Sequence, residues 1–215
     1  MVLDEATKNQ VKELLGRLQD EVSIVYVDKE NPVNKVIREL VQELSDISDK
    51  IKLTIYTHTD KEAKVLGLEE APAIVLLGKN IKGKIVYYGI PSGHEFATLL
   101  DTIIRASTNN PGLTAKSIEF LNSLKEKMKM NVFVTPTCPH CPTSASIALR
   151  YAMYSDKVIG QVIEASEFPE WSQRFNVMGV PKTVINDKGS YVGGYPEDLA
   201  VDQIKQALQG MTLGE

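Results

Sequence analysis

The chain has 215 residues, 43% of them hydrophobic and 24% charged, and a formal net charge of −4 at pH 7. That length suits one large domain or two small ones, and the mild acidity without a basic cluster argues against a nucleic-acid partner. No run of about 18 uncharged apolar residues predicts a membrane span. The acidic N-terminus has no apolar export signal, so we expect a cytoplasmic protein with no membrane partner.

The first half of the chain alternates short β-branched runs with amphipathic stretches. In chain order, it predicts a helix over Leu3–Gln19, a strand at Ser23–Val27 and a helix over Val36–Ile47. A strand follows the Ala71-Pro72 dipeptide, and after a hairpin turn a last helix runs over Gly93–Arg105. This alternation of strands and helices is typical of an α/β fold.

The second half repeats this plan. A predicted helix over Thr114–Met128 precedes a strand at Asn131–Thr135 and a helix over Ser144–Met153. Val180-Pro181 then takes the place of the earlier X-Pro dipeptide, and the last helix covers Glu197–Leu208. Identity between the halves is low, so the repeat rests on the order of the elements.

The halves are separated by the polar segment 107–112, which contains Asn, Pro and Gly. We therefore predict two tandem units, residues 1–108 and 109–215, each an α/β unit with a mixed β-sheet flanked by helices. A strand–helix–strand opening requires a right-handed parallel crossover, and the later hairpin adds antiparallel strands. The sequence leaves open whether each unit has its own sheet or whether edge strands join into one continuous sheet.

The only two cysteines, Cys138 and Cys141, are separated by two residues. A disulfide between them closes so small a loop that it constrains little of the unfolded chain, and a structural disulfide would be unusual in the cytoplasm. Cys138 follows a predicted strand and precedes a predicted helix, where backbone N–H groups and the helix dipole favour a thiolate. We therefore predict redox chemistry, with Cys138 as the nucleophile and Cys141 as the resolving thiol.

Neighbouring residues are expected to tune this chemistry. Pro139 suits the first turn of a helix, and His140 can donate a hydrogen bond toward the Cys138 thiolate. The Val180–Pro181 peptide bond is predicted to be cis, although this is uncommon in general. There it would expose the Val180 backbone for pairing with an extended substrate segment.

Two further side chains are candidates that also have ordinary structural roles. Trp171 either lines the substrate groove or is a partly buried core residue. Glu164 ends the apolar run 158–163 and is a candidate proton acceptor for Cys141, although an exposed carboxylate is the commoner arrangement at a strand end. Ala71-Pro72, at the matching place in the first unit, is predicted to be cis as well.

The cysteine pair also allows interpretations without redox chemistry. It can be half of a zinc site, which usually needs four ligands, or it can be buried and inert. The remaining candidate zinc ligands are His58, His94 and His140. A further hypothesis is a chaperone-like binding module with incidental thiols. Its exposed patch would include Pro32, Pro72 and Ile90.

Longer segments are more specific than the cysteine pair alone. They are LVQELSDISDK (Leu40–Lys50), YYGIPSGHEFA (Tyr87–Ala97), VFVTPTCPHCP (Val132–Pro142), EASEFPEW (Glu164–Trp171) and FNVMGVPK (Phe175–Lys182). Together they resemble the protein disulfide oxidoreductases of thermophilic archaea and bacteria, which consist of two fused thioredoxin-like (glutaredoxin-like) units. The resemblance implies two tandem thioredoxin-like units, an active site for protein disulfides at Cys138 and Cys141, and Pro181 as the adjacent cis-proline.

The first unit departs from that family. Asn31-Pro32-Val33-Asn34 stands where many members have a second C-x-x-C. Asparagine cannot exchange disulfides, so we expect the first unit to be a structural and substrate-docking platform. This puts in doubt any isomerase activity that needs two active sites.

The chain is also similar in plan to the N-terminal region of the alkyl hydroperoxide reductase flavoprotein, whose dithiol passes electrons to a peroxiredoxin. Because the chain lacks a G-x-G-x-x-G fingerprint, we expect no bound flavin or nicotinamide, and the Cys138–Cys141 disulfide is the redox group. We expect no bound metal either. The resemblance implies a separate thioredoxin reductase-like flavoprotein as electron donor. The sequence therefore favours a protein thiol–disulfide oxidoreductase, with a dithiol relay to a peroxiredoxin as the second hypothesis.

Overall fold

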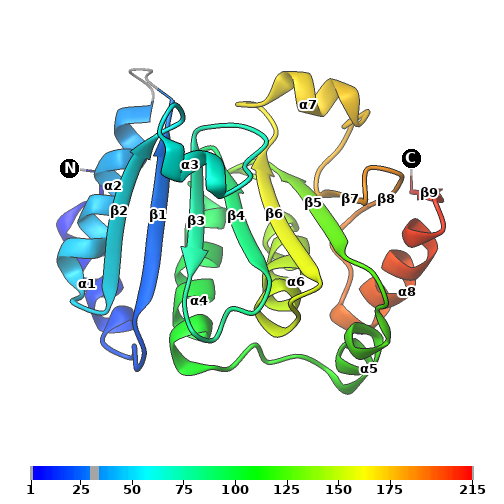
Figure 1. The fold of residues 1–215 in the computed structure, drawn as a ribbon, viewed down its shortest axis with the longest axis horizontal. Helices are drawn as coiled ribbons and strands as arrows, with labels where there is room; N and C mark the ends of the chain where they lie inside the picture. The colour runs from blue at the N-terminus through cyan, green and yellow to red at the C-terminus, as the bar shows by residue number, and fades with distance from the viewer. Residues whose placement is uncertain (1, 30–33, 215) are drawn as a thin grey trace.

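Figure 1 shows the fold of the protein in a computed structural model, which describes residues 2–29 and 34–214. Within these residues the backbone forms one mixed sheet of nine strands, in the order β2-β1-β3-β4-β6-β5-β7-β8-β9. The strands are β1 (Val22–Asp28), β2 (Ile51–Thr57), β3 (Ala73–Leu77), β4 (Lys84–Tyr88), β5 (Met128–Val134), β6 (Val158–Glu164), β7 (Lys182–Ile185), β8 (Gly189–Val192) and β9 (Thr212–Leu213).

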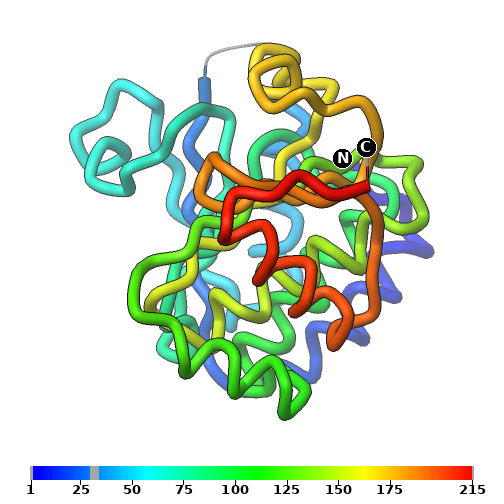
Figure 2. Tube along the Cα trace, turned by 90° about the vertical axis from the view of Figure 1, so that its right-hand side faces the viewer, coloured from blue at the N-terminus to red at the C-terminus, as the bar shows by residue number. Residues whose placement is uncertain are grey.

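Eight helices accompany the sheet in the described part of the chain. They are α1 (Glu5–Leu15), α2 (Lys35–Ile47), α3 (Lys61–Val65), α4 (His94–Thr108), α5 (Ala115–Ser123), α6 (Cys141–Tyr154), α7 (Pro169–Arg174) and α8 (Glu197–Leu208). In Figure 1 helices α4 and α6 lie behind the central strands, and α5 and α8 lie at the lower right. The short helices α3 and α7 lie at the upper end, where β1 and β5 finish. Figure 2 shows α3 standing away from the layer of long helices. Across residues 2–29 and 34–214, no helix has the length and apolar character needed to span a bilayer.

Strand pairing follows the same plan in both halves. In the first half, β1 pairs parallel with β2 and antiparallel with β3, which pairs antiparallel with β4. In the second half, β5 pairs parallel with β6 and antiparallel with β7, which pairs antiparallel with β8. The repeat inferred from the order of elements is therefore a repeat of sheet topology.

The two halves share one continuous sheet. Strand β4 of the first half pairs parallel with β6 of the second, with Lys84 opposite Ile159 and Tyr88 opposite Ile163. Behind the sheet, α4 packs against α6, and the main hydrophobic core contains residues of both halves. The predicted division at residue 108 falls at the end of α4, where Asn109 caps the helix in the left-handed conformation.

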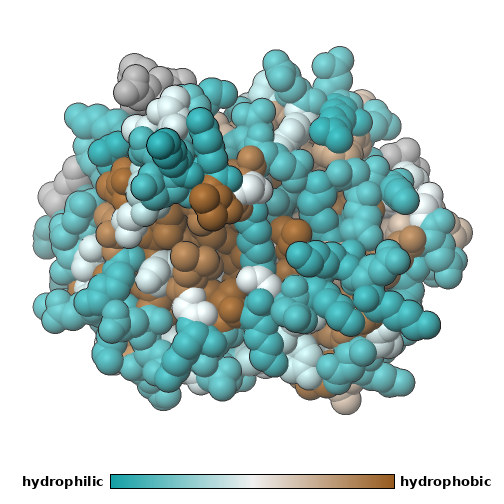
Figure 3. Space-filling view, viewed as in Figure 1, coloured by the Kyte–Doolittle hydropathy of each residue, from teal (hydrophilic) through white to brown (hydrophobic). Residues whose placement is uncertain are grey.

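Strands β5 and β6 lie in the interior of the molecule. Six of the seven residues of β5 are buried, as are six of the seven in β6. A strand covered on both faces loses the alternation of apolar and polar residues that marks a half-exposed strand. These two strands end at the upper edge of the sheet, so residues that follow them are held by a rigid support. The space-filling view in Figure 3 shows apolar side chains gathered between teal, hydrophilic ones on the face seen in Figure 1.

Two predicted helices are shorter in the structure than their amphipathic patterns suggest. Helix α1 begins after Asp4, whose side chain accepts a hydrogen bond from the Thr7 N–H at 2.7 Å, and it is capped at its end by Gly16. Helix α5 begins after Thr114, which caps it by accepting the Ser117 N–H, and ends at Ser123. Capping residues and the early start of β5, rather than hydrophobic spacing, set these limits.

Candidate active site

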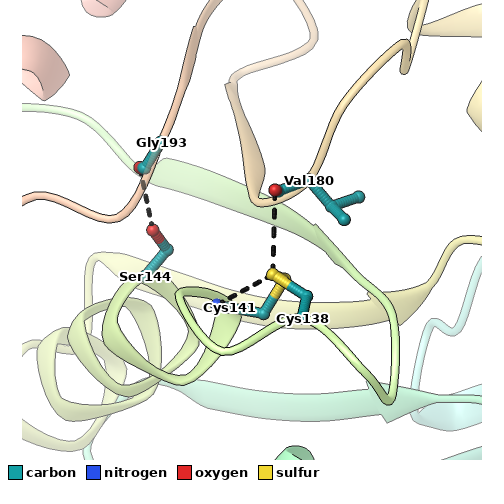
Figure 4. Close-up of a disulfide and its surroundings, with 5 residues drawn as sticks. All are labelled: Cys138, Cys141, Ser144, Val180 and Gly193. Carbon is teal, nitrogen blue, oxygen red and sulfur yellow. Dashed lines mark hydrogen bonds between the residues drawn. A yellow bond between two sulfur atoms is a disulfide. The ribbon is translucent and has the colours of Figure 1, made fainter.

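The two cysteines form a disulfide at the upper end of β5 (Figure 4). Cys138 lies on the loop that leaves β5, and Cys141 is the first residue of α6. Their Cα atoms are 5.5 Å apart. Cys138 keeps 9% of its surface exposed and Cys141 none. Of the two cysteines, only Cys138 therefore reaches the surface.

Two backbone groups surround the Cys138 sulfur. The Cys141 N–H donates a hydrogen bond to the Cys138 Sγ at 3.1 Å, and the Val180 carbonyl oxygen lies 3.7 Å from the same atom (Figure 4). When the disulfide is reduced, the N–H at the start of α6 is in place to stabilise a thiolate on Cys138.

Both X-Pro peptide bonds predicted to be cis are cis: Ala71-Pro72 and Val180-Pro181. Pro181 is buried and directly precedes β7. Its carbonyl oxygen accepts a hydrogen bond from the Gly193 N–H at 2.8 Å, so the proline loop and the loop after β8 support each other beside the disulfide.

The loop after β8 also packs on the turn between the cysteines. Ser144 of α6 donates a hydrogen bond from its hydroxyl to the Gly193 carbonyl at 3.2 Å (Figure 4). A Cβ atom on Gly194 would lie 2.6 Å from the His140 carbonyl oxygen. Only glycine fits so close to that turn, and nothing in the local sequence marks this pair of glycines as part of the site.

The middle residues of the motif require a small correction. Helix α6 begins at Cys141 with His140 as its N-cap, so the proline in the first helical turn is Pro142. Pro139 instead belongs to the turn before the helix, and both Pro139 and His140 are exposed. Within the described residues the His140 side chain makes no capping hydrogen bond.

Glu164 is buried, in contrast to the exposed position that is commoner for a carboxylate at a strand end. It is the last residue of β6 and lies opposite Val134 in the sheet. One carboxylate oxygen accepts the Glu167 N–H at 2.7 Å, and the other has no hydrogen-bond partner within the described chain. The residue lines a small cavity together with Glu95.

Glu95 is a buried titratable group that the sequence did not predict. It lies in the first turn of α4 and is 2% exposed, and neither of its carboxylate oxygens has a partner in the described part of the chain. Burial raises its pKa from 4.5 to about 7, and the nearby Thr98 side chain opposes this shift only in part. In the sequence, an acid in a first helical turn looks like an ordinary partner of the helix dipole, so nothing there signals its burial.

Trp171 is partly buried, on α7. Its ring meets Tyr88 edge-on with centroids 5.0 Å apart, and Phe168 at 5.6 Å. It also lines a cavity next to the Ala71-Pro72 bond of the first unit. Trp171 therefore packs in an aromatic cluster. The cavity that it lines lies beside Ala71-Pro72, so a contact of Trp171 with a substrate at Cys138 stays a prediction.

The first unit offers no thiol at the matching position. Asn31, Pro32 and Val33 lie outside the described residues, whereas Asn34 is buried and its side-chain amide donates to the Lys29 carbonyl. The histidines suggested as zinc ligands do not come together with acidic residues or cysteines in the described chain as a group of three or more.

The strand order, the helix positions and the disulfide site together define the class to which this protein belongs. A disulfide between C-x-x-C cysteines at the start of a helix, facing a cis-proline that precedes the next strand, is the arrangement of thioredoxin-fold redox proteins. Here two such units share a sheet, and only the second contains the cysteine pair.

Comparisons with known proteins agree with this class. Residues 128–208 match the thioredoxin domain family. The chain is 25% identical over 185 residues to an alkyl hydroperoxide reductase of Staphylococcus aureus, a match that covers 86% of this chain and 34% of that protein. The chain thus spans about a third of the length of the curated relatives it matches.

Two solved structures share the whole two-unit fold. A protein disulfide oxidoreductase from Aeropyrum pernix is 26% identical, with a TM-score of 0.84 over 98% of this chain and 97% of that one. An alkylhydroperoxide reductase structure from Enterococcus faecalis is 24% identical, with a TM-score of 0.84 over 95% of this chain and 100% of that one. The chain is a thiol–disulfide oxidoreductase of the thioredoxin fold.

Proposed function

We propose that the protein exchanges disulfides with other proteins through a mixed disulfide on Cys138. The observation that carries this proposal is the difference in access between the cysteines, since Cys138 is 9% exposed and Cys141 is fully buried. The Cys141 N–H at 3.1 Å favours a thiolate on the exposed member of the pair. In the proposed mechanism, Cys138 makes the first attack on the substrate.

The exchange proceeds in two balanced steps. The Cys138 thiolate attacks one sulfur of a substrate disulfide, that S–S bond breaks, and the other substrate sulfur leaves as a thiolate that takes up a proton. Cys141 then loses its proton and attacks the Cys138 sulfur, which releases the substrate as a dithiol. The substrate gains two electrons and the Cys138–Cys141 pair loses them; the reverse sequence oxidises a substrate.

The substrate segment is proposed to lie extended along Val180, beside the disulfide. The Val180 carbonyl oxygen is 3.7 Å from the Cys138 sulfur, so a backbone that pairs with it brings its own cysteine close to Cys138. Trp171 is proposed as a further substrate contact, because Trp171 and Val180 pack against the same hydrophobic cluster.

The proton released by Cys141 needs an acceptor within the protein, because Cys141 is shut off from water. Glu164 is the proposed acceptor, and it shares a cavity with Glu95. A carboxyl group whose pKa lies near neutrality, as for Glu95, can both release and take up a proton at physiological pH. The pair would be tested by the pH dependence of the resolving step in Glu164→Gln and Glu95→Gln.

A thioredoxin reductase-like flavoprotein is proposed as the electron donor. The second candidate function, a dithiol relay to a peroxiredoxin, is favoured by the similarity to alkyl hydroperoxide reductase over 86% of this chain. Insulin reduction with dithiothreitol would support general protein reduction. Rapid reduction by a flavoprotein and reoxidation that depends on peroxide and a peroxiredoxin would support the relay.

A trapping experiment tests the mechanism directly. Cys141→Ser should accumulate a mixed disulfide with a substrate protein such as insulin, visible as a mass increase without reductant, because the resolving thiol is missing. Cys138→Ser is the matched control and should trap nothing. If Cys138→Ser trapped the substrate and Cys141→Ser did not, the assigned roles would be wrong.

The reduction potential of the pair then gives the direction of electron flow. Equilibration against glutathione measures this potential. A value near about −270 mV would indicate a reductase or an electron relay, and a value near or above about −180 mV would indicate a protein that donates disulfides. A chain that formed no disulfide at any glutathione ratio would exclude the redox function.

A further inference from the structure

One cavity in the described chain lies away from the disulfide. It has a volume of about 490 Å³ and sits between the Ala71-Pro72 bond of the first unit and helix α7 of the second. A smaller cavity of about 190 Å³ shares Glu70 and Ala71 with it and continues toward α3. We call the combined hollow, at Glu70, Ala71, Phe168, Glu170 and Trp171, the Ala71 groove.

The groove has the backbone layout of the redox groove without its thiols. Ala71 precedes a cis-proline and a strand, as Val180 does in the second unit. The Pro72 carbonyl is occupied by the Gly89 N–H at 3.1 Å, but within the described residues the Ala71 backbone makes no hydrogen bond. An extended segment can therefore pair with Ala71 as an added strand residue.

One wall of the Ala71 groove is aromatic and held rigidly. Trp171 meets Tyr88 edge-on with centroids 5.0 Å apart. Its ring is tilted by 31° to that of Phe168, with centroids 5.6 Å apart. Trp171 is only partly buried, so part of its ring faces the cavity. An indole face of this kind attracts a cationic side chain.

The charges around the groove are mostly negative. Among the described residues, Glu70, Glu167 and Glu170 line the larger cavity with Lys29. Glu69 and Lys64 line the smaller one. Lys29 is placed 3.7 Å from Glu70, and Glu167 accepts the Ile90 N–H at 2.7 Å. Glu170 is exposed and has no ion pair within the described chain, so its charge is available to a ligand.

We propose that the Ala71 groove binds an extended polypeptide segment bearing an arginine or lysine, whose cationic head lies between Trp171 and Glu170. Ala71 supplies backbone pairing, the aromatic wall covers the aliphatic part of the side chain, and the carboxylate neutralises the charge. Binding uses no sulfur, so it is independent of the exchange chemistry proposed for Cys138. The first unit would then be a docking module for a partner protein.

Fluorescence offers a direct test, because Trp171 is the only tryptophan in the chain. The probe is a cysteine-free peptide of alternating Val and Thr with one central Arg, compared with the same peptide carrying Gln instead. The Arg peptide should change Trp171 emission saturably and bind at least about fivefold more tightly, and its affinity should fall with added salt. Anisotropy of a labelled peptide gives the same constant independently.

Variants locate the binding site. Glu170→Gln should weaken binding of the Arg peptide about fivefold, whereas Glu126→Gln, at an exposed position before β5, should leave it unchanged. A Cys138→Ser, Cys141→Ser double variant should bind as tightly as the unaltered chain. The proposal would be overturned if both peptides bound with equal affinity or if Glu170→Gln had no effect. Loss of binding in the double cysteine variant would also overturn it, because the peptide would then bind at the redox site.

Discussion

Replacing Glu95 with glutamine should make the protein more stable at alkaline pH. Glu95 is 2% exposed, and neither carboxylate oxygen has a partner among the described residues. Burial therefore raises its pKa from 4.5 to about 7. Glutamine has almost the same shape and no charge, so Glu95→Gln removes the titration and leaves the packing nearly intact.

The size and sign of the effect follow from proton linkage. Below pH 4.5 the carboxyl is protonated in both the folded and the unfolded chain, and it has no pH-dependent effect. Between pH 4.5 and about 7 the unfolded chain releases the proton while the folded chain keeps it, so the free energy of unfolding falls by about 1.4 kcal/mol per pH unit. Above pH 7 the loss levels off at about 3 kcal/mol.

Urea unfolding from pH 4 to pH 8.5 measures this directly. The difference in free energy of unfolding between Glu95→Gln and the unaltered chain should rise by about 3 kcal/mol from the acidic to the alkaline end. Glu119→Gln, on the exposed face of α5, is the control and should show no such rise. A difference that stayed flat, or that grew toward acid, would show that Glu95 is ionised in the folded protein and would refute the reasoning.

Two pairs of glycine substitutions test the close contacts around the cysteine loop. Gly194→Ala should lower the free energy of unfolding by about 1–3 kcal/mol in urea titrations, because its Cβ would meet a carbonyl oxygen at 2.6 Å. Gly179→Ala is the control: the nearest atom to its Cβ would be 4.0 Å away, so the change should be less than about 0.5 kcal/mol. Gly93→Ala should cost more than Gly67→Ala, although both have φ of +58°, because only Gly93 would meet the Pro136 carbonyl oxygen, at 2.2 Å. If both variants lost the same free energy of unfolding in these titrations, the backbone conformation alone would explain the effect, and the contact with Pro136 would contribute nothing.

Much of the fold can be predicted because local sequence carries it. The last helix, α8, covers Glu197–Leu208, the range its amphipathic pattern predicts. The cis bonds at Ala71-Pro72 and Val180-Pro181 follow from their matching places in the repeat, and both are cis. These features depend on residues close in the chain or on the repeat itself.

Contacts between distant segments are harder to predict. The sequence leaves open whether the sheets join, since strand edges have no pattern that identifies their partner, and the structure joins them through β4 and β6. The burial of Glu95 and Glu164 is hidden for the same reason. A carboxylate at a helix start or strand end looks solvated until the neighbouring unit covers it.

The cysteine-free unit thus helps to build the surroundings of the cysteine pair. The His94 N–H, at the start of α4, donates a hydrogen bond at 3.1 Å to the carbonyl oxygen of Pro136, two residues before Cys138. Gly93 packs against the same carbonyl so closely that no side chain would fit. The first unit also contributes Glu95 to the cavity beside Glu164. A second unit cut off at residue 109 would lose these contacts and expose the edge of β6, so the two units are expected to act as one redox module even though only one contains cysteines.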